Sequence, residues 1–106
     1  MKSEKFHIDF MLDSIRKIED SVSGIDKELF KNNQEKQSTI ILQLMLIGES
    51  AKKLSEETRK KIDLPWKQII GFRDMAIHDY INLNLDNVWN TVENDIPILK
   101  KELLSS

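Results

Sequence analysis

The sequence predicts an all-α fold, a bundle of four main helices with short helical turns, and three observations support this prediction. The 106-residue chain contains only three glycines and two prolines, so it is poor in the residues that form tight turns. Apolar residues recur at spacings of three and four, which is the pattern of amphipathic helices. The balance of 40% hydrophobic and 32% charged residues is typical of a globular protein. The length suits one domain over residues 1–106.

The first helix is predicted from about Ser3 to Ser23, and Gly24 is placed to end it. Its apolar stripe consists of Ile8, Met11, Leu12, Ile15, Ile18 and Val22. Asp26 then caps a short turn, KELF, whose Leu29 and Phe30 are expected to cover an edge of the core. His7 has no polar constellation around it, and we expect it at the surface.

The second helix is predicted from about Gln34 to Lys61. Its middle, TIILQLML, is apolar almost all round and taken alone could be a buried strand, but the continuation AKKLSEETRKKI is strongly helix-forming. An all-round apolar helix must be covered on more than one side, by the bundle or by a partner subunit. Glycine inside a helix lowers the stability of the helix by about 1 kcal/mol relative to alanine. Because Gly48 stands there despite this loss, we expect it to permit the close approach of another helix.

A break and restart follow at Asp63 to Trp66. Asp63 or Leu64 is expected at the cap and Pro65 in the first turn of a third helix, which should fray near Tyr80. Asn84 is predicted to cap the next helix.

The last helix is predicted over about Leu85 to Leu104. Pro97 should either kink it or mark a short restart capped by Asp95. Trp66 and Trp89 are expected to anchor the core or an interface, with base stacking as an alternative.

Composition excludes several classes of protein. The chain has no cysteine, so disulfides and thiolate metal sites are excluded. The N-terminus lacks a signal peptide's apolar core, and the longest apolar run, Ile40 to Gly48, is far shorter than the ~20 residues of a membrane span. We therefore expect a soluble, cytoplasmic protein without membrane contact. Net charge is −2, but residues 52–73 carry seven basic against three acidic residues, either as a solvated face or as a phosphate-attracting surface.

The residues richest in chemistry lie in FRDMAIHDY, where Arg73, His78 and Tyr80 form R-x-x-x-x-H-x-Y. Arg73 and His78 would lie ~140° apart on an ideal helix, so they do not share one narrow face. A common site needs the helix to end near His78 or needs residues from a second subunit. This spacing points to a site at a dimer interface.

Three stretches resemble the HepT-like branch of the HEPN superfamily, across nearly the whole chain. IGESAKKLSEETR is similar to its I-G-E-A-x-K-x-L signature, LPWKQIIGFRDMAIHDY to its P-W-x-x-I-x-x-x-R-N-x-x-x-H-x-Y segment, and DNVWNTVENDIPILKKEL to its V-W-x-x-V-x-x-D-x-P-x-L tail. The motif residues correspond to Arg73, His78 and Tyr80. Asp74 stands where asparagine is commoner, and its carboxylate could hold Arg73 as an ion pair and temper its pull on phosphate.

The resemblance implies a HEPN-like dimer that acts as a metal-independent ribonuclease, the toxin of a toxin–antitoxin pair. Its partner would be an MntA-type nucleotidyltransferase antitoxin that transfers AMP onto Tyr80. Arg73 and His78 would be the catalytic residues acting on RNA, with no cofactor or metal. Glu49, a charge in an apolar segment, should pair with Arg73 or Lys52 and support the site.

The residue types fit this chemistry. Histidine can carry protons near neutrality, and arginine offers a permanently charged fork to phosphate oxygens. Cleavage needs both an acid and a base, but each chain would supply only one catalytic histidine. A dimer would supply two. The near-neutral charge and Asp74 leave alternatives open: a non-catalytic helical module that binds a nucleotidyltransferase or a nucleotide, or a purely structural dimer.

Overall fold

A computed structural model describes residues 3–105, and every regular element in this range is helical. The long segments are α1 (Glu4–Val22), α3 (Gln34–Lys53), α5 (Trp66–His78) and a C-terminal segment made of α6 (Leu85–Asn90), the π-helical turn η2 (Thr91–Asp95) and α7 (Ile96–Leu104). Short turns lie between them: α2 (Lys27–Lys31), α4 (Glu56–Lys61) and the 3-10 turn η1 (Tyr80–Asn82). The all-α prediction with four main helices is confirmed. None of the helices within residues 3–105 has the length and apolarity that a membrane span requires.

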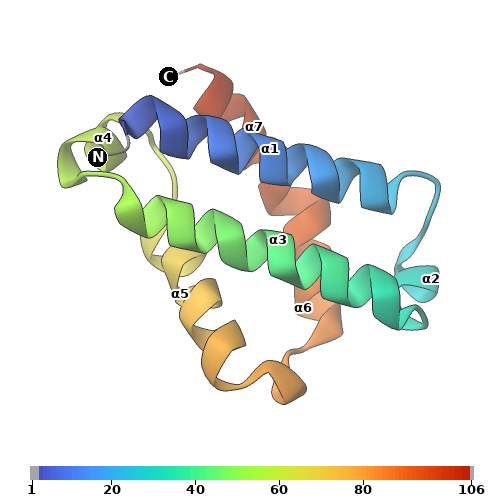
Figure 1. Ribbon diagram of the computed structural model, residues 1–106. Helices are drawn as coiled ribbons and strands as arrows, with labels where there is room; N and C mark the ends of the chain where they lie inside the picture. The colour runs from blue at the N-terminus through green and yellow to red at the C-terminus, as the bar shows by residue number, and fades with distance from the viewer. Residues whose placement is uncertain (1–2, 106) are drawn as a thin grey trace.

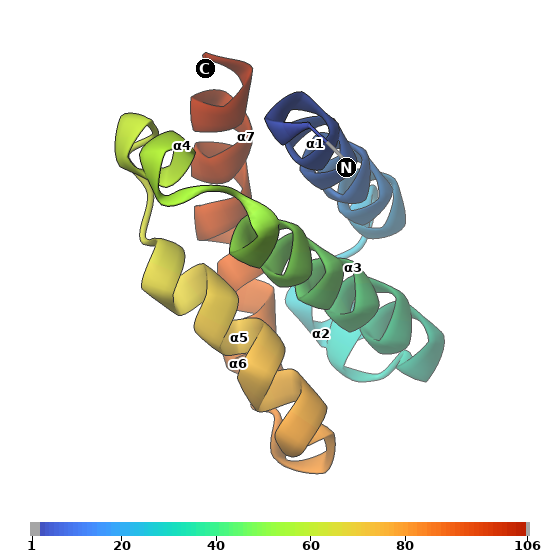
Figure 2. The same ribbon diagram turned by 60° about the vertical axis from the view of Figure 1, so that its left-hand side comes forward.

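Helix α3 occupies the centre of the bundle. It lies between α1 and α5, and the C-terminal segment passes behind it in Figure 1 and beside it in Figure 2. Its apolar middle is therefore covered on more than one side, as the sequence predicted, and the side chains of Ile40, Ile41, Leu44, Ile47 and Ala51 are buried. They belong to one core with the inner faces of α1 and α7.

Side-chain caps set most of the helix starts. Ser3, Asp26 and Asn84 each accept a hydrogen bond from the backbone N–H three residues later, at 3.2, 2.9 and 3.1 Å. The predicted starts of α1, α2 and α6 are thereby confirmed. Gly24, just past the end of α1, has φ +76°, a conformation that glycine adopts without strain. Pro65 does not lie in the first turn of α5 as predicted, because it stands one residue before Trp66 at the cap position.

The predicted single helix from Gln34 to Lys61 is wrong, because α3 ends at Lys53 and α4 begins anew at Glu56. Leu54 turns away from helical geometry and is buried, and the Ser55 hydroxyl caps α4 by accepting from the Thr58 N–H at 3.1 Å. The carboxylate of Glu4, at the start of α1, fixes this break. It accepts from the Ser55 N–H and from the Thr58 hydroxyl, both at 2.7 Å. A contact 51 residues away in sequence thus overrides local helix propensity.

The predictions that His7 lies at the surface and that Leu29 covers an edge of the core are both wrong. His7 is buried rather than exposed, because it precedes Met11 by one turn on the inner stripe of α1, and its ring meets Phe6 edge-on. Phe30 covers the core as expected and packs on the buried ring of Trp89 at a centroid distance of 5.4 Å. Its neighbour Leu29 points outward instead, since adjacent helical residues are 100° apart. Trp66 is half-buried, and its indole N–H donates to two backbone carbonyl oxygens.

The C-terminal segment runs past Pro97 without a restart. Proline has no N–H and its ring crowds the carbonyl four residues earlier, so a regular α-helix cannot continue unchanged there. The preceding turn widens, and the Ile96 N–H donates to the Thr91 carbonyl oxygen, five residues back. Asp95 makes no capping hydrogen bond, so the alternative of a restart capped by Asp95 is wrong.

Gly48 allows the close approach of α3 and α5, as predicted. A Cβ built on Gly48 would lie 2.6 Å from Cβ of Arg73 and 2.9 Å from the carbonyl oxygen of Ile69, both closer than carbon atoms tolerate. Gly71, on the exposed side of α5, has no atom within 4 Å of such a Cβ. A side chain would therefore fit at Gly71 but not at Gly48, where its absence allows the close contact of α3 and α5.

Substituting these two glycines by alanine should have opposite effects on stability. Gly71→Ala should raise the free energy of unfolding by about 1 kcal/mol, because alanine favours the helix and meets nothing. Gly48→Ala should lower it by about 1–3 kcal/mol, because the methyl group forces α5 away from α3. Urea unfolding of both variants measures the difference, and equal shifts would contradict the close helix contact.

The Glu4 carboxylate should make the fold sensitive to acid. Hydrogen bonds from Ser55 and Thr58 lower the pKa of Glu4 from 4.5 to about 2 in the folded protein. A lowered folded-state pKa stabilises the fold above the unfolded pKa, and this contribution is lost as the pH falls toward 2. Glu4→Gln should therefore be less stable than the native chain at neutral pH, and the gap measured by urea unfolding should close below pH 4.5. A gap that persists unchanged at the acid end would refute this role.

Candidate active site

The end of α5 sets the relative positions of the motif residues. Arg73 lies within the helix, whereas His78 is its last residue. Asp79 leaves helical geometry, with φ −147° and ψ 49°, and its N–H closes the helix by donating to the Met75 carbonyl oxygen. Tyr80 then begins the separate turn η1. The helix thus ends at His78, which meets one of the two conditions that the sequence set for a common site.

Arg73 is held by carboxylates from two helices. Its Nε lies 2.8 Å from Oε2 of Glu49 on α3, and its Nη1 donates to Oδ1 of Asp74 at 2.8 Å. The prediction that Glu49 pairs with Arg73 is confirmed, and the predicted Arg73–Asp74 ion pair is also present. Lys53, rather than Lys52, is the lysine within ion-pair distance of Glu49, at 3.9 Å. The guanidinium is consequently fixed in direction but shared between two negative charges.

The charges of this cluster reinforce one another. The hydrogen bond to Asp74, with the charge of Glu49, raises the pKa of Arg73 above its ordinary value. The same hydrogen bond lowers the pKa of Asp74, with further contributions from the charges of Lys52, Arg73 and His78. Arg73 is therefore a permanent cation and Asp74 a permanent anion near neutral pH.

His78 and Tyr80 face solvent. Both residues are exposed, Tyr80 to 47%, and neither side chain makes a hydrogen bond or ion pair within residues 3–105. The charge of His78 makes the smallest of the named contributions to the lowered pKa of Asp74. One chain thus brings Arg73, Asp74 and Glu49 together, whereas His78 and Tyr80 make no hydrogen bond or ion pair with this trio, called here the Arg73 cluster, within residues 3–105.

Apolar side chains border this cluster on the surface. Leu42 and Glu49 are seven residues apart and lie on one stripe of α3, while Ile77 follows Arg73 by one turn of α5. We call Leu42, Glu49, Arg73 and Ile77 the outer face. Leu42 is 51% and Ile77 49% exposed, and Ile81 of η1 is 93% exposed. Large apolar side chains gathered around a charged site are typical of an interface.

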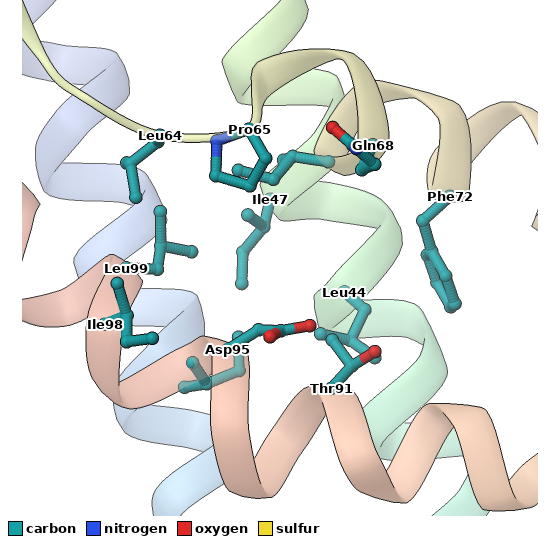
Figure 3. A pocket seen from close by; sticks show the side chains of 12 residues that line it. Leu44, Ile47, Leu64, Pro65, Gln68, Phe72, Thr91, Asp95, Ile98 and Leu99 are labelled. Carbon is teal, nitrogen blue, oxygen red and sulfur yellow. The ribbon is translucent and has the colours of Figure 1, made fainter.

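A cavity of about 400 Å³ lies away from the motif residues. It opens between α3, α5 and the π-helical turn, and it is mostly apolar, with Asp95, Thr91 and Gln68 as polar side chains (Figure 3). Neither Arg73, His78 nor Tyr80 lines it. The candidate site is therefore an open surface in the single chain. Within residues 3–105, no group of three or more histidine and acidic residues is arranged to hold a metal ion.

Lys52 is the site residue whose position the sequence did not reveal. Its charge acts on Asp74, whereas the sequence offered it only as a partner for Glu49. A signal was nevertheless present, because Lys52 follows Gly48 by four residues and therefore lies on the stripe of α3 that faces α5. The break after Lys53, which places Lys52 in the last turn of α3, was not foreseen.

Several known proteins are similar in sequence to this chain. The family model described as Ribonuclease HepT-like matches residues 11–105. A protein of Caldanaerobacter subterraneus subsp. tengcongensis described as a candidate RNase is 33% identical over 104 residues, covering 97% of this chain and 93% of that protein. A protein of Thermococcus cleftensis named "Probable ribonuclease HepT" is 30% identical over 100 residues, covering 93% and 91%.

A longer relative also matches. A Methanocaldococcus jannaschii protein described as a gamma-glutamylcyclotransferase and candidate RNase is 34% identical over 104 residues, covering 97% of this chain but only 47% of that protein. This chain therefore corresponds to about half of that relative. No solved structure shows a significant match.

Proposed function

Because the chain belongs to the ribonuclease HepT-like family, we propose that it is a metal-independent endoribonuclease toxin whose catalytic residues are Arg73 and His78. The observation that carries this proposal is that α5 bears both a guanidinium fixed by two carboxylates and, at its end, an exposed histidine. Relatives named as RNases support the class of activity. The two side chains match the needs of RNA cleavage without a metal.

The reaction requires two proton transfers and one charge stabilisation. The RNA 2′-oxygen attacks phosphorus as a base takes its proton, and the bond to the 5′-oxygen breaks as an acid protonates that oxygen. The products are a cyclic phosphate and a free 5′-hydroxyl. Histidine suits the proton transfers, and Arg73 can face the phosphorane oxygens with its planar donor edge.

We infer that a homodimer completes the site. Each chain offers one exposed histidine, His78, on the helix that carries Arg73, and a second copy would supply the other proton-transfer group. The outer face supports this arrangement, because its exposed Leu42 and Ile77 flank the Glu49–Arg73 pair. Burial of these side chains between two copies would remove apolar surface from water and enclose the charged cluster.

Removing either catalytic side chain should abolish cleavage. His78→Ala should reduce the rate by about 10²–10⁴-fold through loss of proton transfer, and Arg73→Ala by about 10²–10³-fold through loss of charge stabilisation. Cleavage of a labelled RNA by the purified protein in the presence of EDTA measures this. Arg16→Ala is the matched control, because Arg16 is also held between two carboxylates, Asp13 and Asp20 on α1. If the native chain leaves RNA intact, or if the three variants behave alike, the ribonuclease proposal fails.

Dimerisation should depend on the outer face. Leu42→Asp and Ile77→Asp each place a carboxylate where two apolar surfaces would meet, and should convert a dimer to monomers by sedimentation velocity. Ile98→Asp on α7 is the control, because Ile98 is 56% exposed but lies apart from the outer face. A native chain that sediments as a monomer at all concentrations would contradict the composite site.

We further propose that a nucleotidyltransferase antitoxin silences the protein through Tyr80. The tyrosine oxygen would attack the α-phosphorus of ATP, forming a phosphodiester to AMP and releasing pyrophosphate. Tyr80 is 47% exposed, so its hydroxyl is accessible to such an enzyme. The added phosphate would bring negative charge to the edge of the Arg73 cluster, where the RNA phosphate must lie.

The intact mass of the protein should therefore rise by whole AMP units after incubation with the antitoxin and ATP. Tyr80→Phe should abolish the rise, and the test is unambiguous because the chain contains one tyrosine. RNA cleavage should fall in proportion to the modified fraction. A mass increase that survives in Tyr80→Phe would assign the modification to another residue.

A second candidate function is a non-catalytic module that binds a nucleotidyltransferase or a nucleotide. The observation that favours it is the double ion pairing of Arg73, since two carboxylates offset the positive charge that phosphate would need. Tight binding of the transferase without RNA cleavage under any condition would support this function over the first.

A further inference from the structure

The Arg73 cluster has an unfavourable charge for its proposed substrate. One guanidinium is matched by the carboxylates of Glu49 and Asp74, each 2.8 Å away, so the three side chains together carry one net negative charge. A phosphodiester already bears a negative charge, and that charge increases in the transition state. Arg73 can orient the phosphate, but this trio alone cannot attract it.

The last turn of α3 supplies the missing positive charge. Lys53 lies 3.9 Å from Glu49 and partly neutralises it. Lys52 is exposed and has no carboxylate within ion-pair distance among residues 3–105, although its charge lowers the pKa of Asp74. Its ammonium group therefore remains available to an anion that approaches Asp74 and Arg73. When Lys52 and Lys53 are counted together with Arg73, Glu49 and Asp74, the net charge of the group changes from one negative to one positive.

The fold holds Lys52 in this position. Gly48 brings α3 against α5, and Lys52 follows Gly48 by four residues and Glu49 by three. It therefore lies on the side of α3 that faces α5, next to the ion-pair partner of Arg73. Burial of Leu54 and the hydrogen bond from the Ser55 N–H to the Glu4 carboxylate end α3 at Lys53. A lysine at a helix C-terminus also stabilises the helix dipole, but Lys53 in the same turn already serves this role.

We propose that Lys52 is a phosphate-binding residue of the RNA site, whose ammonium group holds the phosphate against Arg73 and offsets the negative charge of Asp74. This inference rests on the proposed ribonuclease function. Arg73, fixed by its two carboxylates, supplies direction, whereas Lys52 on its flexible stem supplies charge. Asp74 thereby has a function. It aligns the guanidinium of Arg73, and Lys52 offsets the negative charge that Asp74 adds to the site.

RNA binding by a cleavage-deficient full chain tests this division of roles. In the His78→Ala background, the affinity for a fluorescein-labelled single-stranded RNA is measured by anisotropy at several salt concentrations. Adding Lys52→Ala should weaken binding about tenfold and reduce the salt slope by about 0.7, the value for one phosphate contact on a single strand. Lys52→Arg should retain the slope. Lys101→Ala, an exposed lysine of α7 without an ion pair among the described residues, should change neither quantity.

A compensating substitution separates a phosphate ligand from a structural lysine. Asp74→Asn removes one negative charge, so adding it to Lys52→Ala should restore most of the lost affinity, while urea unfolding shows the two variants equally stable. If Lys52→Ala binds RNA like Lys101→Ala while the His78→Ala parent binds well, the role of Lys52 is refuted and the ribonuclease proposal stands. If the native chain neither binds nor cleaves RNA, the ribonuclease proposal itself is refuted.

Discussion

The contact between Gly48 of α3 and Arg73 of α5 is the constraint on which the candidate site depends. The absence of a side chain at Gly48 lets the two helices approach until a methyl group would overlap Cβ of Arg73. At this distance Glu49, the next residue of α3, reaches Nε of Arg73. The ion pair therefore follows from helix packing, and a site on one helix becomes a site between two. Any widening of the contact would release the guanidinium.

Interruptions of regular helix place the other charged groups around Arg73. Helix α3 stops at Lys53 because Leu54 is buried and Ser55 starts a new helix, which leaves Lys52 beside α5. Helix α5 stops at His78 because Asp79 leaves helical geometry, which exposes the imidazole at the helix end. A continuous helix at either place would leave these residues within a helix, followed by a further turn, instead of in the last turn. The chemistry of the site thus depends on where helices end as much as on where they pack.

The balance of charge around Arg73 links fold and proposed function. Two carboxylates fix the guanidinium, and rigid placement favours a group that must meet developing charge in a transition state. The same carboxylates reduce its attraction for phosphate, so orientation and attraction are divided between arginine and lysine. The exposed apolar residues of the outer face provide the means to exclude water once a second surface covers them.

Local signals in the sequence determined the helices and the order of the motif residues. Capping by Ser3, Asp26 and Asn84, the glycine after α1 and the apolar periodicity act over a few residues, so each can be predicted without knowledge of the fold. The three family-like stretches likewise identified Arg73, His78 and Tyr80 as candidates. The pairing of Arg73 with Glu49 was predictable because a charge in an apolar segment needs a partner.

Tertiary structure alone decided where α3 ends, that His7 is buried, how Pro97 is accommodated and that Lys52 lies on a helix packed against α5. Each depends on contacts between residues far apart in the chain. Glu4 reaches Ser55 only after α1 has folded back along α3, and the charge of Lys52 lowers the pKa of Asp74 only because Gly48 brings α5 close to α3. Helix propensity favours continuing α3 through Ser55, but burial of Leu54 and a charged hydrogen bond outweigh that small local preference.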